Sequence, residues 1–196
     1  MKSIECYLYL IGILFPIIAY SSILFAISRA SWFSWYLNAL SDLGVYPASS
    51  TIFNLGLITS GFMYCIFSIY LINQYKNYLW RIGVLLLILN ATSLMLVGVF
   101  PENVKFYHGL FALLYFMLFQ VSFILLGFSL VRNSDREFGY MFIIGAIFGL
   151  MLWFIPWRSM GIIGIAIPEL LASLANTIPL LLFSIKNMKQ LNCFET

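Results

Sequence analysis

The chain has 196 residues, of which 63% are hydrophobic and only 9% are charged. A soluble domain carries roughly 25% charged residues, so this composition excludes a water-soluble globular protein and indicates an integral membrane protein. The formal net charge of +3 comes from ten basic and seven acidic residues scattered along the chain. They form no basic patch for nucleic acid, and the expected partners are membrane lipids.

Apolar segments long enough to cross a bilayer as a helix, which takes about 20 residues, occur along the whole chain. None alternates apolar and polar residues, so helices are favoured over a β-barrel. We therefore predict an all-α, polytopic membrane protein that is one transmembrane bundle over residues 1–196. The predicted spans are residues 7–28, 53–73, 81–100, 108–131, 139–157 and 161–185.

The basic residues predict the orientation of this bundle. If the six helices alternate in direction, seven basic residues fall on one side of the membrane and three on the other. Loops rich in Lys and Arg face the cytoplasm as a rule, so we expect a multi-pass protein of the cell membrane with both termini cytoplasmic. The first group is Lys2, Lys76, Arg81, Arg132, Arg136, Lys186 and Lys189, and the second is Arg29, Lys105 and Arg158.

The first loop begins SRASWFSWYLNALSDLG, residues 28–44, in which apolar and polar residues recur at helical spacing. Trp32 and Trp35 are aromatic anchors of the kind found at membrane interfaces, and Gly44 suits the position that ends a helix. We predict an amphipathic helix lying in the outer interface before the second span. Asp42 would lie near its C-terminus, where the helix dipole is unfavourable to an acid, so another group is expected to stabilise that carboxylate.

The third predicted span ends and the fourth begins in GVFPENVKFYHG, residues 98–109. Glu102 lies in the turn, and His108 is the single histidine of the chain. A zinc site normally needs three or four His, Cys or carboxylate ligands, so a histidine-rich site is impossible and no metal is predicted. A metal site formed mainly by carboxylates around His108 remains open as an alternative. Its acids would be Asp42, Glu102 and Glu169.

Glu169 is the strongest single functional signal, because an ionisable group inside a span costs about 2.5–3.5 kcal/mol on insertion scales and marks a partner or a pathway. In a helix that begins at residue 161 it would lie ~12 Å from the outer end. Pro168 beside it is expected to kink the helix. A protonated acid that donates one interhelical hydrogen bond is the structural alternative, with Arg158, His108 and Asp42 as candidate partners.

Two further patterns have structural interpretations. Cys6, Cys65 and Cys193 are far apart and form no CxxC pair, so we interpret them as small apolar residues or inert thiols. Gly145 and Gly149 are four residues apart, a spacing that allows two helices to approach closely.

The acids and the histidine that are not in cytoplasmic segments lie towards the outer face. We hypothesise a polar pocket there, formed by Asp42, His108 and Glu169, with Glu102 and Arg158 at its rim. The pocket would bind or process a lipid headgroup or another amphiphile. If the chemistry is catalytic, His108 is the expected acid or base and Asp42 its orienting partner.

Two other functions remain open. The near absence of extramembrane mass fits a non-catalytic subunit of a larger membrane complex. A small carrier with Glu169 as its proton site is disfavoured, since no inverted repeat relates residues 1–100 to residues 101–196. The chain contains no P-loop, dinucleotide fingerprint, nucleophile elbow or HExxH helix, so no cofactor is assigned and catalysis itself is left open.

The segments ALSDLG, FNLGLITSG and GVFPENVKFYHG, in this order, resemble the six-helix prokaryotic membrane proteins of domain-of-unknown-function family 998. More distantly, the pattern looks like the DRAM/Frag group of eukaryotic membrane proteins, some of which act in lipid-anchor remodelling and autophagy. The residues that match the family pattern are Ser41, Asp42, Gly44, Asn54, Gly61, Gly98, Pro101 and His108.

This resemblance implies a six-helix fold and no established activity. It adds Ser41 and Asn54 to Glu102 and Arg158 as candidate ligand-binding residues. Helix 6 often carries a Glu-Arg pair in such proteins, whereas this chain keeps Glu169 and lacks the arginine.

Overall fold

The structure, a computed structural model, describes residues 2–133 and 135–193. Within these residues every regular element is helical, as the sequence predicts. The long helices are α1 (Lys2–Ser28), α2 (Pro47–Leu71), α3 (Tyr78–Val99), α4 (Lys105–Arg132), α5 (Arg136–Met151) and α6 (Ala166–Gln190). The short 3₁₀ helices are η1 (Ser41–Gly44), η2 (Leu152–Phe154) and η3 (Trp157–Met160).

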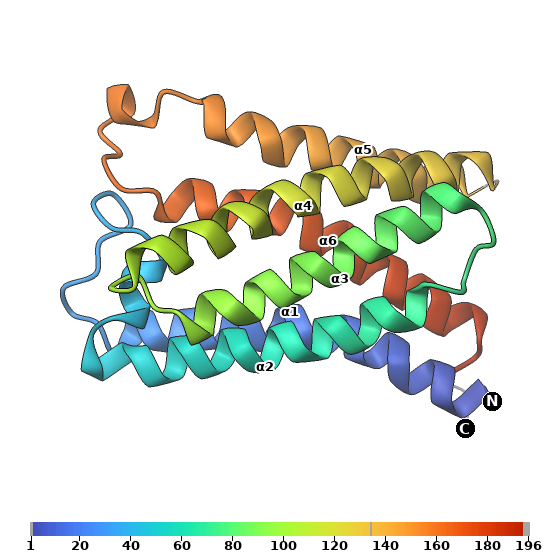
Figure 1. The fold of residues 1–196 in the computed structure, drawn as a ribbon, viewed down its shortest axis with the longest axis horizontal. Coiled ribbons are helices and arrows are strands. Elements are labelled where there is room, and N and C mark those ends of the chain that lie inside the picture. Colours follow the sequence, from blue (N-terminus) through green and yellow to red (C-terminus); the bar gives the residue numbers. More distant parts are fainter. Residues whose placement is uncertain (1, 134, 194–196) are drawn as a thin grey trace.

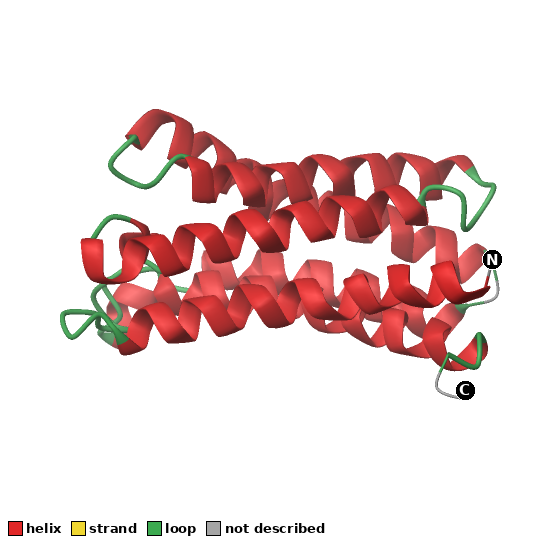
Figure 2. Cartoon of the chain, turned by 90° about the horizontal axis from the view of Figure 1, so that it is seen from below, coloured by secondary structure: helices red, strands yellow, loops and turns green. Residues whose placement is uncertain are grey.

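The long helices run side by side along the long axis of the molecule (Figure 1 and Figure 2). Helices that follow each other in the sequence pack together, and α1 also packs against α6, so the helices form a closed ring. The start of α1 and the end of α6 lie at one end, which we call the terminus end. The opposite end, the loop end, carries the connections formed by residues 29–46, 100–104 and 152–165.

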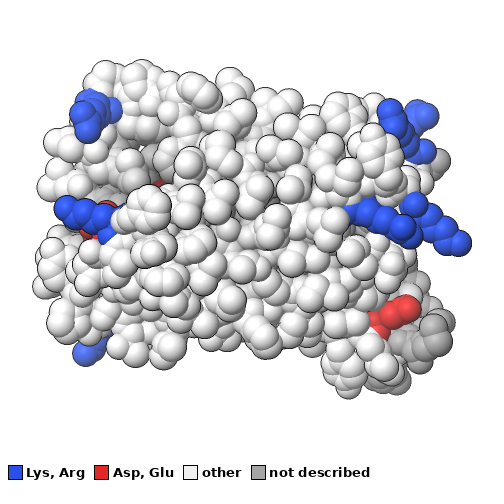
Figure 3. All heavy atoms as spheres, in the orientation of Figure 1, with Lys and Arg blue, Asp and Glu red and all other residues white. Residues whose placement is uncertain are grey.

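The outer surface of the bundle matches a membrane environment. The charged side chains visible in Figure 3 lie at the two ends, and the surface between them is uncharged. Large apolar side chains such as Leu24, Leu55 and Ile144 point outward and are more than half exposed. In the described residues six helices are long and apolar enough to cross a membrane. The protein is therefore a multi-pass membrane protein.

The first loop differs from the interfacial helix that the sequence predicts. Residues 29–40 form turns and irregular backbone, and helical structure is confined to the short η1. The carbonyl oxygen of Tyr36 accepts two backbone hydrogen bonds and that of Asn38 accepts one, all from residues 163–166. A helix needs these carbonyls for its own hydrogen bonds. The loop instead pairs with the chain that leads into α6.

This pairing also moves the start of the sixth span, because α6 begins at Ala166 rather than at residue 161. A Cβ atom at Gly164 would lie 2.3 Å from the Asn38 carbonyl oxygen, so a glycine is needed for this close approach. Glu169 consequently lies in the first turn of α6, and the expected depth of ~12 Å is wrong. Pro168 also falls in this turn, where a missing N–H costs no hydrogen bond, and does not kink the helix.

The two glycines of α5 have the packing role that their spacing predicts. A Cβ atom at Gly145 would lie 2.5 Å from the carbonyl oxygen of Ala175 in α6. One at Gly149 would lie 2.9 Å from Nε2 of Gln120 in α4. Close contact of α5 with both neighbours thus depends on these positions.

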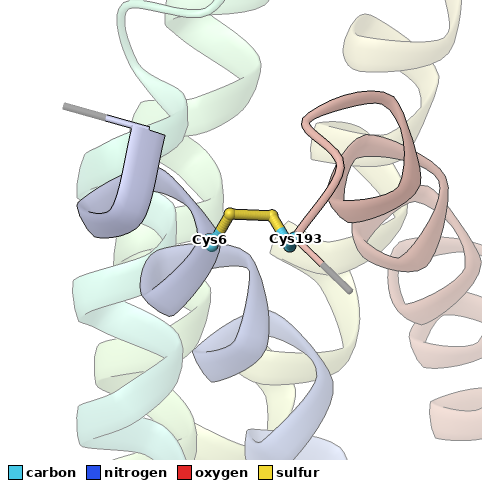
Figure 4. The surroundings of a disulfide bond; sticks show 2 residues. All are labelled: Cys6 and Cys193. Carbon is cyan, nitrogen blue, oxygen red and sulfur yellow. A yellow bond between two sulfur atoms is a disulfide. The ribbon is translucent and has the colours of Figure 1, made fainter. Parts of the chain in front are cut away.

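A disulfide closes the terminus end (Figure 4). It joins Cys6 of α1 to Cys193, which follows α6, with the two Cα atoms 5.7 Å apart. The prediction of inert thiols is therefore wrong for this pair, while Cys65 is a free cysteine. At the same end Lys186 of α6 forms a salt bridge of 2.6 Å with Asp135, just ahead of α5. The C-terminal end of α6 is thus tied to α1 and to the segment ahead of α5.

Candidate functional site

A cavity lies inside the loop-end half of the bundle. It is lined by residues of α1, α2, α3, α4 and α6, and by Leu40 and Ser41 at the start of η1. The cavity has a volume of about 80 Å³, several times what one water molecule requires. The lining is mostly apolar, and its polar side chains are Tyr20, Ser41, Ser60, His108, Tyr115, Glu169, Ser173 and Thr177.

Glu169 reaches the cavity from the first turn of α6. Its side chain is only 9% exposed, and Oε2 accepts a hydrogen bond of 2.7 Å from the backbone N–H of Leu40. The N–H donor and the positive end of the helix dipole favour a carboxylate here, whereas burial favours the neutral acid, so the charged form calls for a cationic partner. For Oε1 we find no hydrogen-bond partner among the described residues.

His108 enters the cavity from the start of α4 and is 7% exposed. Its Nδ1 lies 2.8 Å from the carbonyl oxygen of Phe100. A carbonyl can only accept, so Nδ1 carries the proton and a neutral ring presents Nε2 as an acceptor. The hydrogen bonds of the described residues include none to Nε2. The expected orienting partner, Asp42, is replaced in this role by a backbone oxygen.

Ser41 and Glu102 form a second polar contact at the loop end. Ser41 is the first residue of η1 and lines the cavity, whereas Glu102 lies in the turn between α3 and α4. The Ser41 hydroxyl donates to Glu102 Oε2 at 2.7 Å. Glu102 thus holds the hydroxyl group of Ser41, which lines the cavity.

Asp42 does not line the cavity. Its Oδ2 accepts two hydrogen bonds of 2.9 Å, from Nδ2 of Asn38 and from the backbone N–H of Ala39. These donors are what stabilises an acid at this position, and they make Asp42 a residue that shapes the first loop. Its catalytic role remains a prediction, and the structure does not place it with His108 and Glu169 in the lining.

Asn54 and Arg158 also lie outside the cavity lining. Asn54 of α2 donates from Nδ2 to the Gly44 carbonyl oxygen at 3.0 Å and so holds the end of η1. Arg158 is an exposed residue of η3. In the described part of the chain no group of three or more His, Cys, Asp or Glu side chains could hold a metal ion.

The sequence reasoning missed a pair of hydroxyl groups in the cavity. Tyr20 Oη of α1 lies 2.6 Å from Thr177 Oγ1 of α6, which joins the two helices that close the ring. The sequence does indicate that Thr177 faces the cavity, because Glu169, Ser173 and Thr177 recur every four residues and therefore share one face of a helix. Tyr20 carried no comparable signal.

A protein-family model described as "Protein of unknown function (DUF998)" matches residues 13–186. The chain belongs to the DUF998 family. This confirms the resemblance drawn from the loop motifs, while the prokaryotic origin and the distant likeness to the DRAM/Frag group remain predictions. No curated protein and no solved structure matched this DUF998 chain.

Proposed function

We propose that this DUF998 protein binds a lipid or another single-chain amphiphile in the loop-end cavity. One observation supports this most directly: a mainly apolar cavity carries two buried side chains, Glu169 and His108, each with a polar atom that has no partner in the described residues. Small-molecule sites are commonly apolar clefts with a few convergent polar groups. Binding, rather than a chemical step, is proposed.

The acid and the histidine of the lining lie at one end of the cavity, together with one of its hydroxyl groups. Ser41, His108 and Glu169 come from η1 and from the first turns of α4 and α6, so they lie nearest the loop end. The apolar residues of the lining extend toward the middle of the bundle, as with Phe15 and Leu57. An amphiphile would place its head near the membrane surface and its chain between the helices.

The proposed orientation places the terminus end in the cytoplasm of a cell and the cavity in the outer half of the membrane. It is supported by the seven basic residues of the terminus end against three at the loop end. Disulfides are rare in the cytosol. In this orientation Cys6 and Cys193 would therefore be thiols in the cell and form the disulfide when oxidised.

The binding proposal can be tested with an alkyl amphiphile that carries a diazirine in its chain. The protein would be reconstituted in nanodiscs, irradiated and digested, and the labelled residues mapped by peptide mass spectrometry. Labels at cavity residues such as Tyr20 and Tyr115 are the expected result. Labels confined to lipid-facing residues such as Leu24 and Ile144 would contradict the proposal.

Two cavity-filling variants sharpen this test. Ala19 and Ala112 line the cavity, so Ala19→Phe or Ala112→Phe should remove labels from cavity residues and keep those on lipid-facing residues. Ala48→Phe is the matched control, because Ala48 is exposed in α2 and does not line the cavity. The lipid-facing labels report that each variant is folded in the bilayer.

A further inference from the structure

The hydrogen-bond inventory of the cavity indicates which head group it would accept. Most side-chain donors of the lining are already used within the protein. Ser41 donates to Glu102, and Nδ1 of His108 donates to the Phe100 carbonyl oxygen. Neither of these two protons is available to a ligand.

The hydroxyl groups deeper in the cavity are used in the same way. Thr177 donates to the Ser173 carbonyl oxygen at 2.9 Å, so the contact of 2.6 Å between Thr177 and Tyr20 uses the proton of Tyr20. Ser173 donates to the Leu170 carbonyl oxygen. Ser60 of α2 likewise donates to the carbonyl oxygen of Phe15. Among the polar side chains of the lining, the Tyr115 hydroxyl has no hydrogen-bond partner in the described residues.

When Glu169 is charged, the atoms left over are chiefly acceptors. Oε1 of Glu169 and the lone pair of His108 Nε2 are both unpartnered in the described residues, and both belong to side chains that are at least nine-tenths buried. Lysine and arginine are absent from the lining. The three basic residues of the loop end, Arg29, Lys105 and Arg158, are exposed. An anionic head would therefore meet a carboxylate and a single free hydroxyl donor.

We propose that the amphiphile has a cationic head that bears N–H groups, that is, a primary or secondary amine on an apolar chain. This inference rests on the proposed binding function and names its ligand class. A primary ammonium offers three donors, enough for both free acceptors. Its charge would also compensate the Glu169 carboxylate, since a buried charge is costly unless it is paired.

The test uses four compounds with the same dodecyl chain, which compete with the diazirine amphiphile for labelling of cavity residues in nanodiscs. They are dodecylamine, dodecyltrimethylammonium, dodecanol and dodecyl phosphate, compared at equal mole fraction in the membrane. Dodecylamine should compete about tenfold better than dodecanol, as one charge-assisted hydrogen bond implies. The trimethylammonium compound has the charge but no N–H group and should compete poorly.

Two variants separate recognition in the cavity from adsorption of cations to the membrane. Glu169→Gln keeps an acceptor for the Leu40 N–H and removes the charge, so it should abolish the advantage of the amine and preserve competition by dodecanol. Glu137→Gln is the matched control, because Glu137 is exposed at the terminus end, and it should behave as wild type.

Each outcome decides between the two proposals. If dodecyl phosphate or dodecyltrimethylammonium competes best at cavity residues of the wild type, or if the amine keeps its advantage in Glu169→Gln, the amine inference is overturned and the binding function stands. If the diazirine amphiphile never labels cavity residues, the binding function itself fails. The wild-type series decides the inference even if Glu169→Gln does not fold.

Discussion

The backbone N–H of Leu40 donates to the carboxylate of Glu169 across 129 residues of sequence, at 2.7 Å. This bond fastens the first loop to the start of α6 at the loop end of the cavity. It makes Glu169 a structural as well as a candidate binding residue. The two roles can be separated, because they depend on different oxygen atoms of one side chain.

We expect Glu169→Ala to lower the free energy of unfolding by about 1–3 kcal/mol, because the buried Leu40 N–H loses its acceptor. Glu169→Gln supplies a neutral acceptor and should unfold close to wild type. Thermal unfolding of the detergent-solubilised protein measures both variants. Equal melting temperatures for the alanine and glutamine variants would show that the Leu40 bond contributes nothing measurable.

The junction between the first loop and α6 should be intolerant of any side chain at Gly164. In Gly164→Ala the new Cβ atom would meet the Asn38 backbone at 2.3 Å, and backbone cannot move aside as a flexible side chain can. A loss of about 1–3 kcal/mol in stability is expected, as for other overpacked sites. Gly109→Ala is the control, since a Cβ there meets nothing within 4 Å and replaces a helical glycine. A fully stable Gly164→Ala would contradict the close approach.

Asp42→Ala tests whether this acid shapes the loop or takes part in binding. Removing the acceptor of the Asn38 and Ala39 donors should lower stability by about 1 kcal/mol, while Asp42→Asn, which keeps one oxygen, should lose less. Photolabelling of the cavity should persist in both variants, because Asp42 is not in the lining. Loss of cavity labelling in a stable Asp42→Asn protein would instead support the role in the site that its position in the sequence suggested.

The disulfide should contribute about 2–4 kcal/mol to the stability of the oxidised protein. Reduction, or the Cys6→Ser variant, is expected to lower the melting temperature of purified protein, whereas Cys65→Ser should have little effect because Cys65 is free. An unchanged melting temperature on reduction would indicate that the bond stabilises nothing.

The same cysteines test the proposed orientation. If the terminus end is cytoplasmic, alkylation of intact cells with a membrane-permeant reagent should trap Cys6 and Cys193 as thiols, and an added oxidant should join them. A fully oxidised pair in untreated cells would place this end in an oxidising compartment and reverse the orientation. The oxidised form is identified by comparing wild type with Cys6→Ser in the same experiment.

The long helices were predictable because each depends on a local property, the length of an apolar run. Their ends were not, since they depend on contacts between distant segments. α2 begins at Pro47, where the absent N–H is tolerated, rather than at residue 53. α6 begins late because the residues before it pair with Tyr36 and Asn38. The periodicity of residues 28–44 is real, but these tertiary hydrogen bonds outweigh it.

Residues of the candidate site could be predicted from the sequence, but only some of the contacts between them could. Glu169 and His108 were found from their rarity in an apolar chain, and both line one cavity. The partner of His108 is a backbone carbonyl, which has no signature in sequence. The partner of Cys6 lies 187 residues away, and cysteine spacing could not identify it.

The disulfide also limits how the bundle can move. α1 and α6 are the first and last helices of the ring, and their contact is the one that no short loop maintains. Cys6 bonded to Cys193 holds the two helices together at the terminus end, and the hydrogen bonds of Tyr36 and Asn38 to residues 163–166 do so at the loop end. Between these two ties the seam is bridged by Tyr20 and Thr177. The seam between the first and last helices is thus fastened near both ends of the bundle and between them.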